Sequence, residues 1–260
     1  MGRQYLINFD SRRLPQRTAQ ILVIGSGIAG LFAAWTAAQT GAAVTVLTKG
    51  KLFESNTRQA QGGIAAAVGQ YDAPQDHGRD TVVAGAGLCD ADAVDILVAE
   101  GPARVKELIG LGVRFDRDGE GVCLTREGGH GRRRVLHASG DATGAEIVRA
   151  LGEAIIGLPN VEVREDEYAV DLLVADNVCY GVVALERGCR QLRVVRSGTV
   201  VLATGGCGQL YDYTSNPGIA TGDGMALAYR AGAEMMDMEF VQFHPTVLAV
   251  PDSGGFLISE

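Results

Sequence analysis

Six residues near the N-terminus have the types and spacing needed to hold a phosphate group. Gly25-Ser26-Gly27-Ile28-Ala29-Gly30 fits the pattern G-x-G-x-x-G, between a β-branched run and an Ala-rich run. The first glycine permits a tight turn, the second lets a pyrophosphate approach the backbone, and the third brings helix and strand together. The N-terminus of the helix adds unpaired N–H groups and partial positive charge. The motif therefore predicts a dinucleotide site formed by these six residues.

The residues that follow the next strand bear on which dinucleotide is bound. An Asp or Glu that binds a ribose 2′-hydroxyl usually stands about 20 residues after the motif, but Thr48 and Lys49 occupy that region. Either these two residues serve the adenosine half of FAD, or Lys49 and Lys51 accept the 2′-phosphate of NADP. The segment TVVLATGG at 199–206 resembles the second glycine-ended strand of two-dinucleotide-fold flavoproteins. A simple NADP dehydrogenase has no use for such a strand, so we expect FAD.

Alternating strand and helix patterns surround the motif and predict the elements that position it. Residues 20–24 and 43–47 are typical of buried parallel strands, and residues 28–39 have helical apolar spacing. This unit predicts an α/β fold, a Rossmann-like FAD-binding domain of the two-dinucleotide-fold type with a small antiparallel β element. The other expected elements are irregular chain at 50–90, helices at 91–111, 145–156 and 224–232, an antiparallel sheet within 161–195 and a buried strand at 198–206. The apolar face expected for the first of these helices is Val94, Leu97, Val98, Val105, Leu108 and Ile109.

Charge and composition narrow the classes of function. The chain has 260 residues, with 23 Lys and Arg against 31 Asp and Glu, and its net charge of −8 argues against nucleic acid as a partner. Its 5 cysteines form no C-x-x-C pair, which predicts reduced thiols in the cytoplasm and no metal site. Residues 21–48 carry no charge, a length that exceeds the about 20 residues of a membrane span. Glycines and polar residues interrupt that run, so we expect a strand–helix–strand unit and no membrane association.

Four longer segments give the chain a resemblance to a known family. They are ESNTRQAQGGIAA (54–66), LTREGGH (124–130), TSNPGIATGDGMALAYRAGA (214–233) and EFVQFHPT (239–246). Together with the glycine motif they resemble the L-aspartate oxidases of the succinate dehydrogenase/fumarate reductase flavoprotein superfamily. The resemblance implies an enzyme that uses FAD to oxidise L-aspartate to iminoaspartate, with O2 or fumarate as electron acceptor. This reaction is the first step of the quinolinate route to NAD, which implies a functional coupling to quinolinate synthase.

Two positions discriminate within this superfamily. Members of membrane complexes carry a histidine, between a Ser and a Thr, that is linked covalently to the flavin. Asn56 stands at that place here, so the resemblance implies non-covalent FAD. Aspartate oxidases have a carboxylate at the position of Glu127, and it can bind the α-ammonium group that distinguishes L-aspartate from succinate. Glu127 is therefore the expected catalytic residue, and a surface Glu paired with Arg126 or Arg132 is the alternative interpretation.

The resemblance assigns further residues to the site. His244 and Gln242, together with Ser259 and Glu260, are expected to bind the dicarboxylate substrate. Expected FAD contacts besides the glycine motif are Lys49, Asn56, Thr57, Arg58, Gln59, Ala60, Gln61, Gly62, Gly63 and Asp223. The arginine run at 132–134 is interpreted equally well as substrate steering or as a solvated surface, and His130 and His137 stay unassigned.

The expected domain organisation is an arm at 1–18, an incomplete FAD-binding domain at 19–240 and the truncated beginning of a capping domain at 241–260. In relatives, the arginine that serves as the catalytic base lies farther downstream. We therefore expect an N-terminal fragment that is a poor or inactive catalyst by itself. Two alternatives stay open: a soluble fumarate reductase or succinate dehydrogenase flavoprotein, and an inactive FAD-binding remnant.

Overall fold

The computed structural model describes residues 5–119, 121–244, 246–248, 250 and 257–258. The chain divides into two compact units. The first contains the described residues up to Thr57 and those from Leu151 to Ile258, and the second contains residues 58–150. The domain boundaries expected after residues 18 and 240 stay predictions.

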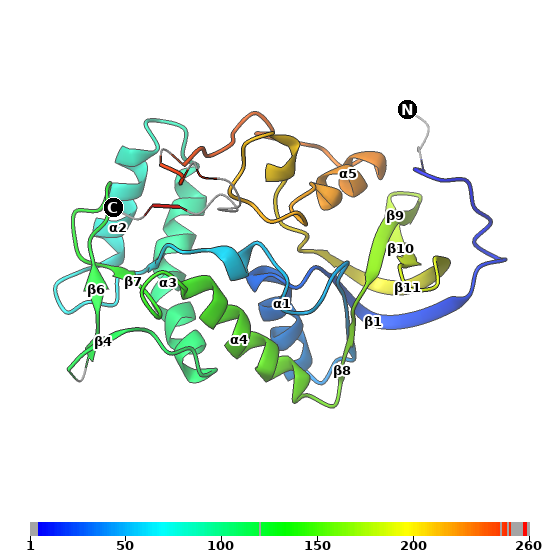
Figure 1. Cartoon of the computed structure of the whole chain (residues 1–260), viewed down its shortest axis with the longest axis horizontal. Coiled ribbons are helices and arrows are strands. Elements are labelled where there is room, and N and C mark those ends of the chain that lie inside the picture. The colour runs from blue at the N-terminus through cyan, green and yellow to red at the C-terminus, as the bar shows by residue number, and fades with distance from the viewer. Residues whose placement is uncertain (1–4, 120, 245, 249, 251–256, 259–260) are drawn as a thin grey trace. The chain divides into compact units, whose positions relative to one another are not determined.

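A six-stranded sheet forms the centre of the first unit (Figure 1). Its strands are β1 (Gln16–Ile24), β2 (Val44–Leu47), β8 (Val161–Arg164), β9 (Glu167–Ala175), β10 (Val178–Glu186) and β11 (Gln191–Leu202). Their order across the sheet is β8-β2-β1-β11-β10-β9. The first four strands in this order are parallel, whereas β10 pairs antiparallel with both β11 and β9. This mixed sheet with its helices confirms the predicted Rossmann-like α/β fold class.

Strand β11 joins the parallel and antiparallel parts of the sheet. Its residues Gln191 to Arg196 pair antiparallel with β10, and residues from Val194 to Leu202 pair in parallel with β1. The strand expected at 198–206 is therefore the second half of a longer strand, and the antiparallel strands continue the parallel sheet. One part of the expectation for 161–195 was wrong, because β8 pairs in parallel with β2.

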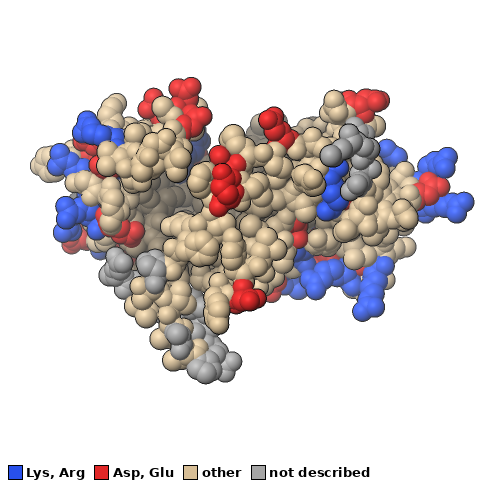
Figure 2. All heavy atoms as spheres, turned by 90° about the horizontal axis from the view of Figure 1, so that it is seen from above, with Lys and Arg blue, Asp and Glu red and all other residues tan. Residues whose placement is uncertain are grey.

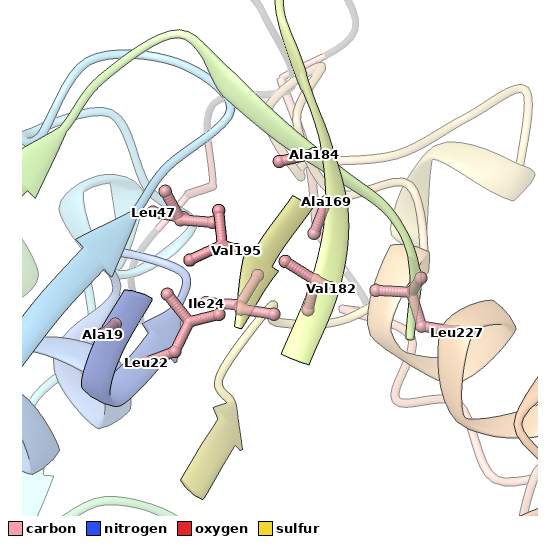
Figure 3. Close-up of a cluster of buried hydrophobic side chains, with 9 residues drawn as sticks. All are labelled: Ala19, Leu22, Ile24, Leu47, Ala169, Val182, Ala184, Val195 and Leu227. Atoms are coloured by element: carbon pink, nitrogen blue, oxygen red, sulfur yellow. The ribbon is translucent and has the colours of Figure 1, made fainter. Parts of the chain in front are cut away.

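Two helices and a buried cluster fix the strand ends of the first unit. Helix α1 (Ile28–Gln39) packs on β1, β2 and β11, and α5 (Asp223–Arg230) packs on β9. Gly41 follows the C-cap residue Thr40 with φ +84 and donates from its N–H to the carbonyl of Ala38 at 3.0 Å, which ends the helix. The cluster shown in Figure 3 comprises Ala19, Leu22, Ile24, Leu47, Ala169, Val182, Ala184, Val195 and Leu227. Burial of each large member stabilises the fold by about 1.5–3 kcal/mol.

The second unit is built from packed helices and small sheets. Helix α2 (Pro74–Ala84) packs against α3 (Ala91–Gly110). One sheet has the order β3-β7-β6, and its strands are β3 (Ile64–Ala65), β7 (Val135–Leu136) and β6 (Leu124–Thr125). The other sheet pairs β4 (Arg117–Asp118) with β5 (Gly121–Val122). Helix α4 (Thr143–Ile156) and the short 3-10 helix η1 (Thr57–Gln59) each contain residues of both units, and a second 3-10 helix, η2 (Gly208–Leu210), belongs to the first unit.

Two expectations for the second unit were wrong. The segment 50–90 is not irregular throughout, because α2 begins there with Pro74 at its first turn. Its sequence has little apolar periodicity, so the proline was the only helix signal. In α3, Leu97 and Ile109 are 59% and 37% exposed. The buried residues of that helix are Val94, Val98, Val105 and Leu108.

The surface gives two further facts about the described residues. None of their helices is both long enough and apolar enough to cross a lipid bilayer. Figure 2 shows Lys and Arg side chains together with Asp and Glu side chains on one face.

Candidate functional site

A cleft in the first unit lies where three parallel strands end. Strands β1, β2 and β11 end at Ile24, Leu47 and Leu202, and the residues after each of them line this cleft. Its empty space is about 710 Å³, open solvent included. Ligands of open α/β sheets bind outside the carboxyl ends of the strands. The position of the cleft is therefore that of a cofactor site.

Gly25 and Gly30 lack side chains for steric reasons. Gly25 has φ +110, and a Cβ there would lie 2.1 Å from the carbonyl oxygen of Ala203. A Cβ at Gly30 would lie 2.0 Å from the carbonyl oxygen of Gly25. Gly25 also donates from its N–H to the carbonyl of Leu47 at 2.8 Å, which ties the turn to the end of β2. These two glycines shape the turn and bring α1 against it.

Gly27 lacks a side chain for a different reason. Its φ is −74, and a Cβ there would have one close neighbour, Thr57 Oγ1 at 3.2 Å. Gly27 lines the cleft, so its missing side chain leaves room for a ligand beside the backbone. Ile28 donates from its N–H to Thr57 Oγ1 at 3.1 Å, whereas the N–H groups of Ala29 and Gly30 have no acceptor in the described part of the chain. Such a helix N-terminus binds an anion such as a phosphate.

A charged pair with two hydroxyl partners lies in the same cleft. Lys49 forms an ion pair with Asp223, and their side chains are 22% and 13% exposed. Lys49 Nζ also donates to Thr221 Oγ1 at 2.6 Å, and the Tyr168 hydroxyl donates to Asp223 Oδ1 at 3.3 Å. Burial raises the pKa of Tyr168, and the negative charge of Asp223 raises it further. The pair places an ammonium group and a carboxylate at fixed points of the cleft wall.

Several lining residues were not found from the sequence. Glu167, Tyr168 and Ala169 come from the start of β9, which is separated from β2 by three strands in the sheet order. Glu167 nevertheless donates from its N–H to the carbonyl of Thr48 at 3.0 Å. The other missed lining residues are Ile24, Leu47, Glu54, Ser55, Ile219, Ala220 and Leu227. Their types are those of ordinary strand and loop residues, so no sequence signal distinguished them.

A family model supplies the observation that decides the cofactor. The model described as FAD binding domain matches residues 20–260. The chain belongs to this FAD-binding family. FAD is its cofactor. The cleft fits the anionic pyrophosphate of FAD, because Gly27 leaves space beside the backbone and two N–H groups at the start of α1 are unpaired among the described residues. The ammonium group of Lys49 adds a positive charge to the same cleft. The interpretation that invoked NADP is not supported.

The chain is similar in sequence to L-aspartate oxidases and in structure to a fumarate reductase. It is 54% identical to the L-aspartate oxidase of Streptomyces coelicolor, over 88% of this chain and 40% of that protein. It is 46% identical to the chloroplastic L-aspartate oxidase 2-a of Nicotiana tabacum, over 94% of this chain and 38% of that protein. Among solved structures, a variant of E. coli quinol fumarate reductase FrdA matches 95% of this chain and 42% of its own, with TM-score 0.89 and 36% identity. The chain thus spans about two fifths of the length of these relatives.

The predicted FAD contacts fall into three groups in the structure. The cleft of the first unit is lined by Gly25, Ser26, Gly27, Lys49, Asn56, Thr57 and Asp223. The first turn of α1, next to this glycine turn, contains Ile28, Ala29 and Gly30. The second unit contains Arg58, Gln59, Ala60, Gln61, Gly62 and Gly63. The cleft therefore unites seven of the sixteen predicted contacts, and the roles of the others stay predictions.

The predicted substrate residues of the first unit do not line the FAD cleft. Gln242 and His244 are exposed, and His244 Nδ1 lies 2.9 Å from the carbonyl oxygen of Thr246. Ser259 and Glu260 lie outside the described residues. The described residues contain no group of three or more His, Cys, Asp or Glu that could hold a metal ion.

The predicted catalytic residue lies in the second unit. The Glu127 side chain is 51% exposed, and its Oε1 lies 3.0 Å from His137 Nε2. Among the ion pairs of the described residues, none joins Glu127 to Arg126 or Arg132, so the alternative interpretation has no support. Arg134 is fully buried and pairs with Asp72 and Asp80, which gives it a structural role.

Proposed function

We propose that this chain is the FAD-binding part of an L-aspartate oxidase, which converts L-aspartate to iminoaspartate. The observation that supports this most is its 54% identity to the Streptomyces coelicolor L-aspartate oxidase over 88% of the chain. FAD, when bound, would supply the acceptor for the hydride of the substrate Cα–H bond, while the nitrogen gives up a proton as the C=N bond forms, and O2 or fumarate would reoxidise the flavin. The protein supplies binding, orientation and electrostatic complementarity.

The predicted substrate residues have complementary chemistry toward L-aspartate. Glu127 presents a half-exposed carboxylate to the α-ammonium group. His244 is engaged through Nδ1, so Nε2 is left for a substrate carboxylate, because no partner of Nε2 occurs among the described residues. Gln242, Ser259 and Glu260 complete the proposed substrate-binding set. Hydrogen bonds between charged groups are about twice as strong as neutral ones, so this set favours a zwitterionic dicarboxylate.

Flavin reduction by alternative substrates tests this proposal. The FAD-loaded protein is mixed without oxygen with L-aspartate, D-aspartate or succinate, and the visible flavin absorbance is followed. Because we expect the chain to be a poor catalyst by itself, we expect slow bleaching by L-aspartate and much less by the other two. Equal bleaching by succinate would instead support a fumarate reductase or succinate dehydrogenase flavoprotein. Bound FAD that none of the three reduces would support an inactive remnant.

We also infer that a second enzyme consumes the product and that both act in the cytoplasm. Iminoaspartate hydrolyses in water, so quinolinate synthase must take it up soon after release. The five cysteines are unpaired in the structure, which supports a reducing compartment. Quinolinate formation by the mixed enzymes, compared with the two separated by a dialysis membrane, tests the coupling, and cell fractionation tests the compartment.

A further inference from the structure

We propose that His137 is a positioning residue for Glu127: it holds one carboxylate oxygen so that the other receives the ammonium group of the substrate. This inference rests on the proposed function, because it needs an amino dicarboxylate as the ligand. Everything that supports it lies within the second unit, in β6, in β7 and in loop residues of that unit.

The contacts of His137 fix which ring nitrogen carries hydrogen. His137 Nε2 lies 3.0 Å from Glu127 Oε1 and 3.1 Å from Thr125 Oγ1. The Thr125 hydroxyl donates to the carbonyl of Val135 at 3.4 Å, so its oxygen is left to accept. An ionised carboxylate can only accept a hydrogen bond. A hydrogen on Nε2 suits both of these neighbours, and the proposal therefore assigns Nε2 as the donor.

The donor is held by the strand that precedes it. Val135 and Leu136 of β7 are 2% and 0% exposed, and His137 follows them directly. The carbonyl of His137 accepts a hydrogen bond from the Asp116 N–H at 2.8 Å. A Cβ at Gly63 would lie 2.9 Å from His137 Nε2, so the ring packs closely against this backbone. The imidazole is thus in place before any ligand arrives.

Glu127 itself has few restraints apart from this contact. It is followed by Gly128 and Gly129, and Gly129 has φ +82. An exposed Glu side chain loses rotamer freedom when it is ordered. Because His137 orders the side chain in advance, a ligand does not bear that cost. The Oε2 atom of Glu127 has no hydrogen bond or ion pair in the described part of the chain, so it is available to an ammonium group.

A histidine suits this task better than an arginine or a lysine would. With Nδ1 unprotonated the imidazole is neutral, so it orients the carboxylate and leaves its negative charge uncompensated. A permanently charged partner would cancel the attraction for the substrate ammonium group. The three exposed arginines of this segment, Arg126, Arg132 and Arg133, form no ion pair with Glu127 in the described structure. The pair should therefore raise the preference for L-aspartate over succinate.

Ligand binding by variants of the FAD-loaded protein tests this role. His137→Phe keeps an aromatic ring and removes the donor, and His137→Gln restores an N–H donor. We expect the preference for L-aspartate over succinate, measured as the ratio of their Kd values from flavin absorbance, to fall about tenfold in His137→Phe. Succinate affinity should not change, and His137→Gln should recover most of the preference. Lys106→Gln, an exposed change on α3, is the matched control.

A spectroscopic readout separates this inference from the proposed function. Nitrogen-15 spectra at alkaline pH report the tautomer of each histidine, and His137→Phe assigns the signal. We expect His137 with its hydrogen on Nε2. The other tautomer, or an aspartate preference that survives in His137→Phe, would overturn the positioning role alone. A wild-type protein that binds succinate as well as L-aspartate would overturn the proposed function, and the positioning role with it.

Discussion

Gly25, Gly27 and Gly30 look equivalent in the sequence pattern, but the structure gives each a different reason to lack a side chain. Gly25 combines a positive φ with a carbonyl oxygen in the space of a Cβ, and Gly30 faces the carbonyl of Gly25. Gly27 has neither obstacle and borders the cleft. We therefore predict that the first and third glycines are required for folding and the second for FAD binding.

Alanine substitutions should separate these roles. Gly25→Ala should lower the free energy of unfolding by about 3 kcal/mol or more, because strain and overpacking add. In the absence of FAD, Gly27→Ala should have the same free energy of unfolding as the wild type. Its affinity for FAD should be lower. The wild type should gain about 2.7 kcal/mol of stability at an FAD concentration of 100 times Kd, and Gly27→Ala should gain much less at that concentration. Urea unfolding with and without FAD measures both effects, and a Gly27→Ala protein that binds FAD normally would contradict the assignment.

The ion pair of Lys49 and Asp223 should act as a unit. Both side chains are mostly buried, so removal of one partner leaves the other charge without compensation. In a double-mutant cycle of Lys49→Met and Asp223→Asn, we expect a coupling energy of about 1–3 kcal/mol in the FAD-free protein. Urea unfolding of the four proteins gives this value. Strictly additive effects would show that the pair is not formed in solution.

At the scale of elements, a buried network of charged residues connects α2 to Arg134, the residue directly before β7. Arg134 donates to Asp72 at 2.8 and 2.9 Å through two of its nitrogens, and it also forms an ion pair with Asp80. The ring centroids of His77 and His130, next to Arg134, are 5.8 Å apart. Burial lowers the pKa of His77, and the positive charge of Arg134 lowers it further. The hydrogen bond from the Gly131 N–H, and next the one from Arg134, lower the pKa of Asp80. Both shifts make this element pair sensitive to acid.

The second unit should lose stability in two steps as the pH falls. Because the pKa of His77 is lower in the folded protein than its ordinary 6.5, the unfolded chain binds more protons below that pH, and the free energy of unfolding falls. The same sign holds for Asp80 below its ordinary 3.8. We expect His77→Phe to remove the first step and to keep the second. Urea unfolding at a series of pH values measures this, with His244→Phe as a control; an unchanged first step in His77→Phe would refute it.

The elements show where sequence patterns succeed and where they fail. Helix α1 has the predicted bounds because its apolar spacing and flanking glycines are local signals. Helix α2 was missed because tertiary contacts stabilise it, namely packing on α3 and the network around Arg134, and its own apolar pattern is weak. In α3 the pattern overestimated the buried face, because Leu97 and Ile109 have no neighbour to cover them.

At the scale of the whole molecule, the FAD should be released when the protein unfolds. Asn56 lines the cleft at the place where some relatives carry a flavin-linked histidine, and an amide cannot form that bond. We expect acid precipitation of the purified protein to leave all yellow colour in the supernatant. Flavin fluorescence that stays with the denatured polypeptide on a gel would contradict non-covalent binding.

The sequence by itself determined the α/β class, the glycine turn, the cofactor and the family, because each depends on short segments whose spacing is set by backbone geometry. The resemblance also gave the prediction, still to be tested, that Glu127 binds the ammonium group of the substrate. Only the tertiary structure decided that β9 brings Glu167 and Tyr168 beside Thr48, and that Lys49 meets Asp223. It also decided that His137 contacts Glu127. Such contacts join residues far apart in the chain, and their geometry depends on strand order and packing, which no local pattern encodes.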